Sequence, residues 1–121
     1  MPSISRENNI KLSRGDSLSM GLFINKGTAL CPIRYDLSGN DTVYFAVMEE
    51  NQRFEDAIIK KVYNSESLKT SEGDLLIKLK PQDTEDLLSG MYRYTIKLKR
   101  EISQDNFDVV TLVPEHQLYI M

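Results

Sequence analysis

The sequence predicts an all-β domain, an antiparallel β-sandwich with one short helical turn near residues 81–88. Apolar residues recur at most alternate positions in six segments, and only one stretch begins like a helix. Turn-forming residues at 13–16, 38–41 and 72–74 precede three of these segments. A period of two is the spacing of a strand that buries one face. Several short strands joined by turns, with little helix, are typical of a sandwich or a barrel.

The expected strands differ in how clearly they alternate. Residues 92–99 have the cleanest pattern, and residues 42–47 are rich in the β-branched and aromatic residues that favour strands. Pro114 interrupts the last segment and predicts a bulge or an edge position there. The positions in phase are Leu18, Met20, Leu22 and Ile24; Val43, Phe45 and Val47; Ile58, Lys60 and Val62; Leu75, Ile77 and Leu79; Tyr92, Tyr94, Ile96 and Leu98; and Val109, Thr111, Val113, Leu118 and Ile120.

A short helical segment is expected before the cleanest strand. Pro81 suits a first helical position, because its missing N–H would be unpaired there in any case. Asp83 and the two acids that follow it favour the positive end of the helix dipole. Leu87 and Leu88 are expected to fill the end of the sandwich, and Gly90 ends the segment.

The length and composition fit a single domain over residues 1–121, with residues 1–8 expected to form a flexible N-terminal arm. Apolar residues make up 40% of the chain and charged residues 27%, which is ordinary for a globular protein. A chain of this length buries enough surface to need no metal or disulfide. Cys31 is the single cysteine, which excludes an intramolecular disulfide and favours a reducing compartment.

The charge and the N-terminus narrow the expected partners and location. The net charge of −3 argues against nucleic acid, because proteins that bind it usually carry a basic excess. The sequence shows no signal-peptide core near residue 1 and no apolar run that approaches the ~18 residues of a membrane span. We therefore expect no membrane partner and a chain that is made in the cytoplasm.

Gly90 and Tyr92 indicate which type of β-sandwich to expect. In immunoglobulin-like sandwiches a tyrosine near the start of strand F bonds back to the backbone upstream. Tyr92 is placed for this role and Gly90 for the turn before it, so residues 91–100 and 108–120 become strands F and G. The strand over 74–80 is then strand E of the opposite sheet. We predict an immunoglobulin-like sandwich with this structural corner; the alternative is that Tyr92 is only an inward-facing aromatic residue.

Several short motifs have both a chemical and a structural interpretation. Residues 14–16 spell Arg-Gly-Asp, a cell-adhesion tripeptide, but they also suit a turn before the first strand. Residues 36–41 place oxygen-bearing side chains as a calcium loop begins, yet Val47 occupies the place of its bidentate glutamate. Cys31 before Pro32 lacks a basic setting that would activate a thiolate. We expect turns at the first two motifs and a structural cysteine at the third.

No catalytic or metal-binding residue is predicted. His116 is the single histidine, and no second histidine or cysteine pair completes a metal site with it. We expect His116 on the surface or in a loop. Asp83, Glu85 and Asp86 lie within one helical turn, whereas paired catalytic acids face each other across a cleft. They are expected to be surface charges.

Basic side chains are expected to form two outward stripes on different sheets. No aromatic residue interleaves on the lysine-bearing face, as stacking on single-stranded nucleic acid would require. We expect solvated faces, with contact to an acidic partner as the alternative. The stripes comprise Lys78 and Lys80, and Lys97, Lys99 and Arg100.

Three segments, in their order and spacing, resemble a family of structural domains. The family is that of the immunoglobulin-like domains of phage and prophage structural proteins from low-GC Gram-positive hosts, such as the N-terminal domain of baseplate upper proteins. The resemblance covers roughly residues 15–120. Ser89 and Lys80 stand where the family typically has a proline and a serine or threonine. The segments are Gly15-Asp16-Ser17-Leu18; Tyr35-Asp36-Leu37-Ser38-Gly39 with Val43-Tyr44-Phe45-Ala46-Val47; and Leu79-Lys80-Pro81-Gln82-Asp83-Thr84 with Leu88-Ser89-Gly90-Met91-Tyr92-Arg93-Tyr94.

This resemblance implies a non-catalytic virion protein, a component of a baseplate, a tail or a head decoration, made in the bacterial cytoplasm. Its partners would be other virion proteins or copies of itself, and no cofactor is implied. Phe23, Tyr44 and Leu76 fall on the outward faces of the expected strands. They form a candidate interaction surface for self-association through one of the sheets.

Two other functions remain as alternatives. A carbohydrate-binding β-sandwich would use exposed aromatic platforms, for which Tyr44, Phe54 and Tyr63 are the candidates. An enzyme would require a cleft that joins His116 to a distant acid and a nucleophile.

Overall fold

The computed structural model describes residues 3–4, 9–26, 30–31, 33–71 and 73–121. These residues form mainly strands, with one α-helix, α1 (Pro81–Thr84), and one 3-10 turn, η1 (Phe54–Asp56). The prediction of a mostly β fold is therefore confirmed. The described part of the chain holds no helix that is long and apolar enough to cross a membrane. The strands are β1 (Ser3–Ile4), β2 (Ile10–Leu12), β3 (Leu18–Leu22), β4 (Asp41–Met48), β5 (Ile59–Tyr63), β6 (Leu75–Leu79), β7 (Gly90–Ser103) and β8 (Asn106–Ile120).

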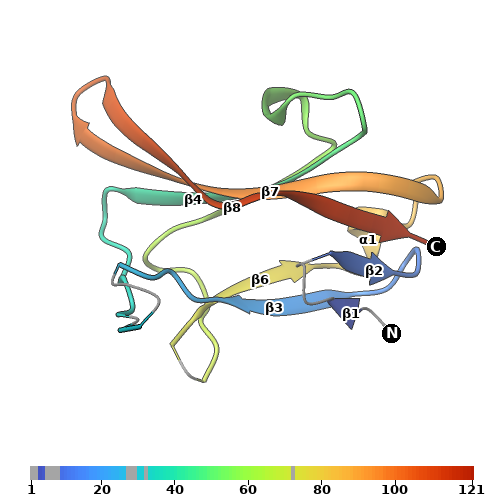
Figure 1. The fold of residues 1–121 in the computed structure, drawn as a ribbon, viewed down its shortest axis with the longest axis horizontal. Coiled ribbons are helices and arrows are strands. Elements are labelled where there is room, and N and C mark those ends of the chain that lie inside the picture. Colours follow the sequence, from blue (N-terminus) through green and yellow to red (C-terminus); the bar gives the residue numbers. More distant parts are fainter. Residues whose placement is uncertain (1–2, 5–8, 27–29, 32, 72) are drawn as a thin grey trace.

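The strands form a large curled sheet and a small two-stranded one. The six-stranded sheet has the order β1-β2-β8-β7-β4-β5, and the second sheet pairs β3 with β6. Figure 1 shows β4, β7 and β8 in one layer above β3 and β6, with β1 and β2 beside the C-terminal end of β8 and close to the lower layer. The larger sheet thus resembles half a barrel, against which the small sheet packs.

The larger sheet is mixed, which corrects the prediction of a purely antiparallel fold. β2 runs parallel to β8, with Ile10 opposite Leu118 and Leu12 opposite Ile120. The other neighbouring strands of the described chain are antiparallel. A strand of three residues carries too short an alternation to be recognised by its period. Of the predicted N-terminal arm, residues 1–8, only β1 falls within the described residues, and it pairs with β2.

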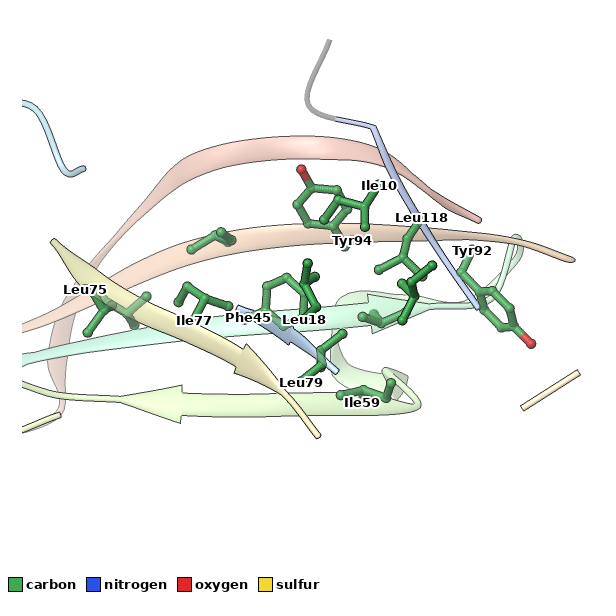
Figure 2. Close-up of a cluster of buried hydrophobic side chains, with 14 of the residues drawn as sticks. Ile10, Leu18, Phe45, Ile59, Leu75, Ile77, Leu79, Tyr92, Tyr94 and Leu118 are labelled. Atoms are coloured by element: carbon green, nitrogen blue, oxygen red, sulfur yellow. The ribbon is translucent and has the colours of Figure 1, made fainter. Parts of the chain in front are cut away.

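One hydrophobic core fills the space between the two sheets. The rings of Phe45 in β4 and Tyr94 in β7 lie 5.7 Å apart between centroids, and Ile77 and Leu79 join the same cluster from β6 (Figure 2). The inward positions predicted for β3, β4, β6 and β7 are buried or partly buried, although Ala46 and Thr95, which lie between such positions, are buried as well. The buried in-phase residues are Leu18, Ile24, Val43, Phe45, Val47, Leu75, Ile77, Leu79, Tyr92, Tyr94, Ile96, Leu98, Leu118 and Ile120.

The predicted faces of β5 are wrong by one residue. Ile59 is buried opposite Val47, whereas Val62 is 57% exposed. A shift of one residue exchanges the two faces of a strand. The other positions in phase with Ile59 are Lys61 and Tyr63, so the inner side of β5 lacks the aliphatic pattern that would identify it.

Pro114 lies in a β-bulge inside β8 and does not end the strand. β8 has two residues between the partners of Tyr94 and Ile96, where β7 has only Thr95. The Thr95 Oγ1 hydroxyl donates a hydrogen bond to the Val113 carbonyl oxygen, 2.7 Å away. The bulge predicted from the proline is therefore confirmed.

The segment between β6 and β7 begins with a single helical turn. Asp83 Oδ2 accepts a hydrogen bond of 2.7 Å from the backbone N–H just before α1, and its Oδ1 accepts one of 2.8 Å from Lys61 Nζ in β5. Thr84 is fully buried, and Leu87 packs partly against the core. Leu88 is 78% exposed, so the prediction that it fills the end of the core is wrong.

Candidate functional site

Tyr92 and Gly90 form the turn that leads into β7. The Tyr92 hydroxyl donates a hydrogen bond to the carbonyl oxygen of Leu88, 2.7 Å away, and its ring is buried. Gly90 has a φ of +150°, a conformation that side-chain-bearing residues rarely adopt. A hydroxyl that bonds to upstream backbone is the feature expected of a tyrosine corner. These contacts hold the connection between α1 and β7 in place, which is a structural role.

The Arg-Gly-Asp turn, residues 14–16, forms hydrogen bonds with α1 and with the segment that follows it. The Gly15 N–H donates to Oγ1 of the buried Thr84 at 3.0 Å, and the Arg14 guanidinium donates to the Leu87 carbonyl oxygen at 3.3 Å. Gly15 has a φ of +85°, which glycine adopts at little cost. The tripeptide therefore helps to pack the turn before β3 against α1.

Asp41 is buried, and both oxygens of its carboxylate accept hydrogen bonds from other residues of the chain. Its Oδ1 accepts from Arg100 Nε at 3.1 Å, and its Oδ2 accepts from the Tyr35 hydroxyl at 2.6 Å and the Ser38 N–H at 2.8 Å. The Arg100 guanidinium also lies 4.9 Å from the centre of the Tyr35 ring. The calcium-like motif over residues 36–41 is thus a turn whose last carboxylate is an internal anchor.

The residues of the predicted interaction surface lie on two separate layers. Phe23 and Leu76 lie on the outer side of the small sheet, where the Phe23 ring is 42% exposed and lies 5.3 Å from the Arg34 guanidinium. Tyr44 belongs to the outer face of the larger sheet and meets the Phe54 ring edge-on, with centroids 6.3 Å apart. The three residues therefore do not form one surface.

A pocket of about 370 Å³ lies around Tyr44 and Phe54 on the outer face of the larger sheet. The ammonium groups of Lys60 and Lys97 lie 4.8 and 4.6 Å from the centre of the Phe54 ring, at distances typical of cation–π contacts. We call this site the lysine–aromatic pocket. It is lined by Tyr44, Phe54, Glu55, Lys60, Lys97, Lys99 and Val109.

The pocket corrects two expectations about the basic stripe on β7. Aromatic residues do interleave with the lysines, because Phe54 reaches over the sheet from η1 and Lys99 Nζ lies 3.9 Å from the centre of the Phe107 ring. Phe54 lies in a connection, where no strand period could place it on this face. Arg100 is not part of the stripe, since it pairs with the buried Asp41.

Arg93 holds the segment that carries Phe54 against the sheet. Its guanidinium donates to the carbonyl oxygens of Glu49 at 3.1 Å and Gln52 at 2.6 Å, and it forms an ion pair with Glu115 of β8. Because Arg93 lies in β7, these contacts fasten the turn after β4 onto the strand that supplies two of the pocket lysines. The sequence contains no local signal for this long-range anchor.

The sequence predicts His116 on the surface or in a loop, and the structure places it at the surface, partly buried, in the strand β8. Its ring centroid is 6.1 Å from that of Tyr94, and it lines a wide surface groove of about 820 Å³ together with Glu50 and Glu115. Glu115 is engaged by Arg93. No serine, threonine, cysteine or lysine is among the described residues that line this groove, so they include no nucleophile of the kind that a triad requires.

The remaining candidate residues are dispersed. Cys31 is exposed, as are Glu85 and Asp86 after α1. Lys78 is exposed on β6, in the other layer from the lysine–aromatic pocket. Tyr63 lies on the inner side of β5, where its hydroxyl accepts a hydrogen bond of 3.2 Å from the Lys78 N–H. Tyr63 is therefore separate from the aromatic pair of the pocket.

The hairpin of β7 and β8 projects beyond the core as a ribbon, which we call the β7–β8 arm, residues 100–111 (Figure 1). Every residue of the arm is exposed, and no described strand other than β7 and β8 pairs within residues 101–111. A two-stranded ribbon alone is marginally stable in water. Its exposed apolar side chains favour contact with a partner. They are Ile102, Phe107, Val109 and Val110, which are 55%, 42%, 62% and 52% exposed.

The arm and the pocket were not recognised from the sequence, and comparison with known proteins adds no assignment to either. Searches against protein-family models, curated proteins and solved structures found no match to this chain.

Proposed function

We propose that this chain is a non-catalytic structural protein of a phage or prophage particle that acts through protein–protein contacts of the β7–β8 arm. The observation that carries the proposal is an exposed and partly apolar ribbon that extends from an otherwise closed core. Such a ribbon can pack against a neighbouring subunit without disturbing its own core. The segments that resemble virion domains support the same function.

We also propose that the fold is immunoglobulin-like. The order β8-β7-β4-β5 corresponds to strands G, F, C and C′ of such a fold, and the pair β3-β6 corresponds to B and E. The hydrogen bond from Tyr92 to upstream backbone supports this correspondence. The parallel pairing of β2 with β8 then attaches the N-terminal strand to the edge of strand G.

The base of the arm offers a second element of the proposed contact. A hollow of about 200 Å³ lies there, and Tyr35, Leu98, Val110 and Leu112 contribute to its lining. An apolar side chain of a neighbouring subunit would be removed from water in this hollow. The proposed interface therefore combines the exposed ribbon with the hollow at its base.

Mass spectrometry of particles induced from a lysogen that carries the gene tests this function. We expect the wild-type chain in purified particles, and about tenfold or greater depletion of the double variant Ile102→Ser, Val110→Ser, which removes two exposed apolar side chains that the proposed interface would bury. The matched control is Val62→Ser, because Val62 is similarly exposed but lies on β5, away from the arm. This control is expected to enter particles as the wild type does.

Two outcomes would reject the proposal. Absence of the wild-type chain from particles and from assembly intermediates would remove the virion function. Incorporation of the arm variant at the wild-type level would show that the arm is not the contact surface.

A further inference from the structure

The lysine–aromatic pocket concentrates positive charge on an acidic chain. The whole chain carries a net charge of −3, yet three lysines and one carboxylate, Glu55, line this pocket. Within the described part of the chain, none of Lys60, Lys97 and Lys99 forms an ion pair. Like charges held close together repel, so an anionic group placed among these ammonium groups would be stabilised.

Contacts with aromatic rings hold these lysines in place. Phe54 lies under the ammonium groups of Lys60 and Lys97, and Phe107 lies under that of Lys99. Lys97 and Lys99 occupy alternate positions of β7, so their stems leave the sheet on the same side, ~7 Å apart. The positive groups are therefore arranged before any ligand arrives, which lowers the entropy cost of binding.

The rest of the lining indicates a ligand with both apolar and hydroxyl groups. Tyr44, Phe54 and Val109 supply apolar surface, and the exposed Glu55 supplies a carboxylate that can accept hydrogen bonds. Glu55 would repel a ligand that carries only negative charge. A sugar ring offers C–H groups to the aromatic surface and hydroxyl donors to Glu55. The cavity of about 370 Å³ lies within the ~300–1,000 Å³ range of small-molecule sites.

We propose that the lysine–aromatic pocket binds an acidic saccharide, a sugar that carries a carboxylate or a phosphate group. The anionic group lies among Lys60, Lys97 and Lys99, and the sugar ring packs against Phe54 and Tyr44. Both anionic groups accept charge-assisted hydrogen bonds from ammonium donors. This site lies on the outer face of the sheet and shares Val109 with the arm, but its ligand does not depend on the proposed assembly function.

Calorimetric titration of the full chain, with amide chemical shifts to locate the site, tests this proposal. The probes are trigalacturonate for the carboxylate, glucose 6-phosphate for the phosphate, maltotriose as a neutral sugar and an oligothymidylate as a nucleic acid. We expect at least one acidic sugar to bind about tenfold or more tightly than maltotriose. The acidic sugar that binds more tightly identifies the source of the anionic group.

Variants then assign the binding to the lysines. The double variant Lys97→Gln, Lys99→Gln is expected to weaken acidic-sugar binding about tenfold or more. Lys78→Gln is the matched control, since Lys78 is an exposed strand lysine in the other layer, and it should bind as the wild type does. Phe54→Tyr, which keeps the ring, is expected to retain binding.

Three outcomes would overturn the inference. The first is that neither acidic sugar binds at millimolar concentration. The second is that the double lysine variant, shown to be folded by its amide spectrum, binds as tightly as the wild type. The third is that oligothymidylate binds more tightly than both sugars, which would make the pocket a nucleic-acid site.

Discussion

The Asp41 carboxylate and the Arg100 guanidinium meet across the β4–β7 pair, where Oδ1 accepts a hydrogen bond from Nε at 3.1 Å. Asp41 is 1% exposed, and the side chain of Arg100 is 45% exposed. The pair therefore joins the closed core to the first residue of the β7–β8 arm. Tyr35 completes the group, since its hydroxyl donates to the same carboxylate and its ring lies beside the guanidinium.

Replacement of Asp41 is expected to destabilise the fold strongly. Asp41→Asn removes a buried charge that accepts hydrogen bonds from Tyr35, Ser38 and Arg100. We expect the free energy of unfolding to fall by about 2–3 kcal/mol in urea denaturation. Asp56→Asn, at an exposed position in η1, should change it by less than about 0.5 kcal/mol. Equal effects of the two variants would contradict the anchoring role of Asp41.

The hydroxyl of Tyr92 should make a smaller contribution. Tyr92→Phe keeps the buried ring but removes the hydrogen bond to the Leu88 carbonyl oxygen. We expect a loss of about 1 kcal/mol in the free energy of unfolding, as is typical for a single hydrogen bond. Tyr119→Phe is the control, because Tyr119 is 37% exposed on β8. An unchanged denaturation midpoint for Tyr92→Phe would show that this hydroxyl does not stabilise the corner.

Asp83 should make stability depend on pH in the acid range. Burial raises the pKa of the Asp83 carboxyl, but hydrogen bonds from Lys61 and from the Lys80 N–H outweigh burial and lower the pKa below its ordinary value of 3.8. A carboxyl with a lowered pKa in the folded state stabilises the fold above its unfolded pKa. This stabilisation is lost as the pH falls through the folded pKa.

The measurement is the urea midpoint of the wild type and of Asp83→Asn across the acid range. We expect the wild type to be the more stable protein at neutral pH, and the difference to shrink as the pH falls from about 5 to about 2. Asp86→Asn, at an exposed position after α1, should follow the wild-type profile. A difference between wild type and Asp83→Asn that stays constant with pH would exclude this linkage.

The arm should open far more readily than the core. Residues 101–109 have no third strand beside them in the described chain, whereas residues 93–98 lie between β4 and β8. We expect amide hydrogens of the arm to exchange with solvent at least about a hundredfold faster than those of residues 93–98. Hydrogen exchange read by mass spectrometry or by amide spectra measures this ratio in the isolated chain. Equal protection would indicate that the arm is already paired, for example in a dimer.

The strands of the core were predictable because their pattern is local. Ile77 and Tyr94 each lie in a segment of at least five residues in which buried and exposed positions alternate or nearly so, and that period is a property of the sequence itself. The inner face of β5 could not be predicted in this way, because Lys61 and Tyr63 occupy the inner positions beside Ile59. The period of a strand reports burial only where the buried side chains are apolar.

The candidate site depends on contacts between distant parts of the chain, which no local pattern reports. Phe54 reaches Lys97 because Arg93 fastens the turn after β4 to β7. Arg100 is different, because it is in phase with Leu98 and the alternation of β7 already places it on the opposite side from Lys97 and Lys99. Its ion pair with the buried Asp41 comes from an element far away in the sequence.

The bulge at Pro114 limits aggregation of this chain through its open strand edge. β2 covers the outer edge of β8 only at residues 118–120, so the rest of that edge has no partner strand in the described chain. An uninterrupted open edge can pair with strands of other molecules, which leads to aggregation. Pro114 has no N–H to offer and its bulge breaks the ladder, so an added strand could extend only along the arm. At this edge the proline thereby confines intermolecular strand pairing to the arm, which is the proposed contact surface.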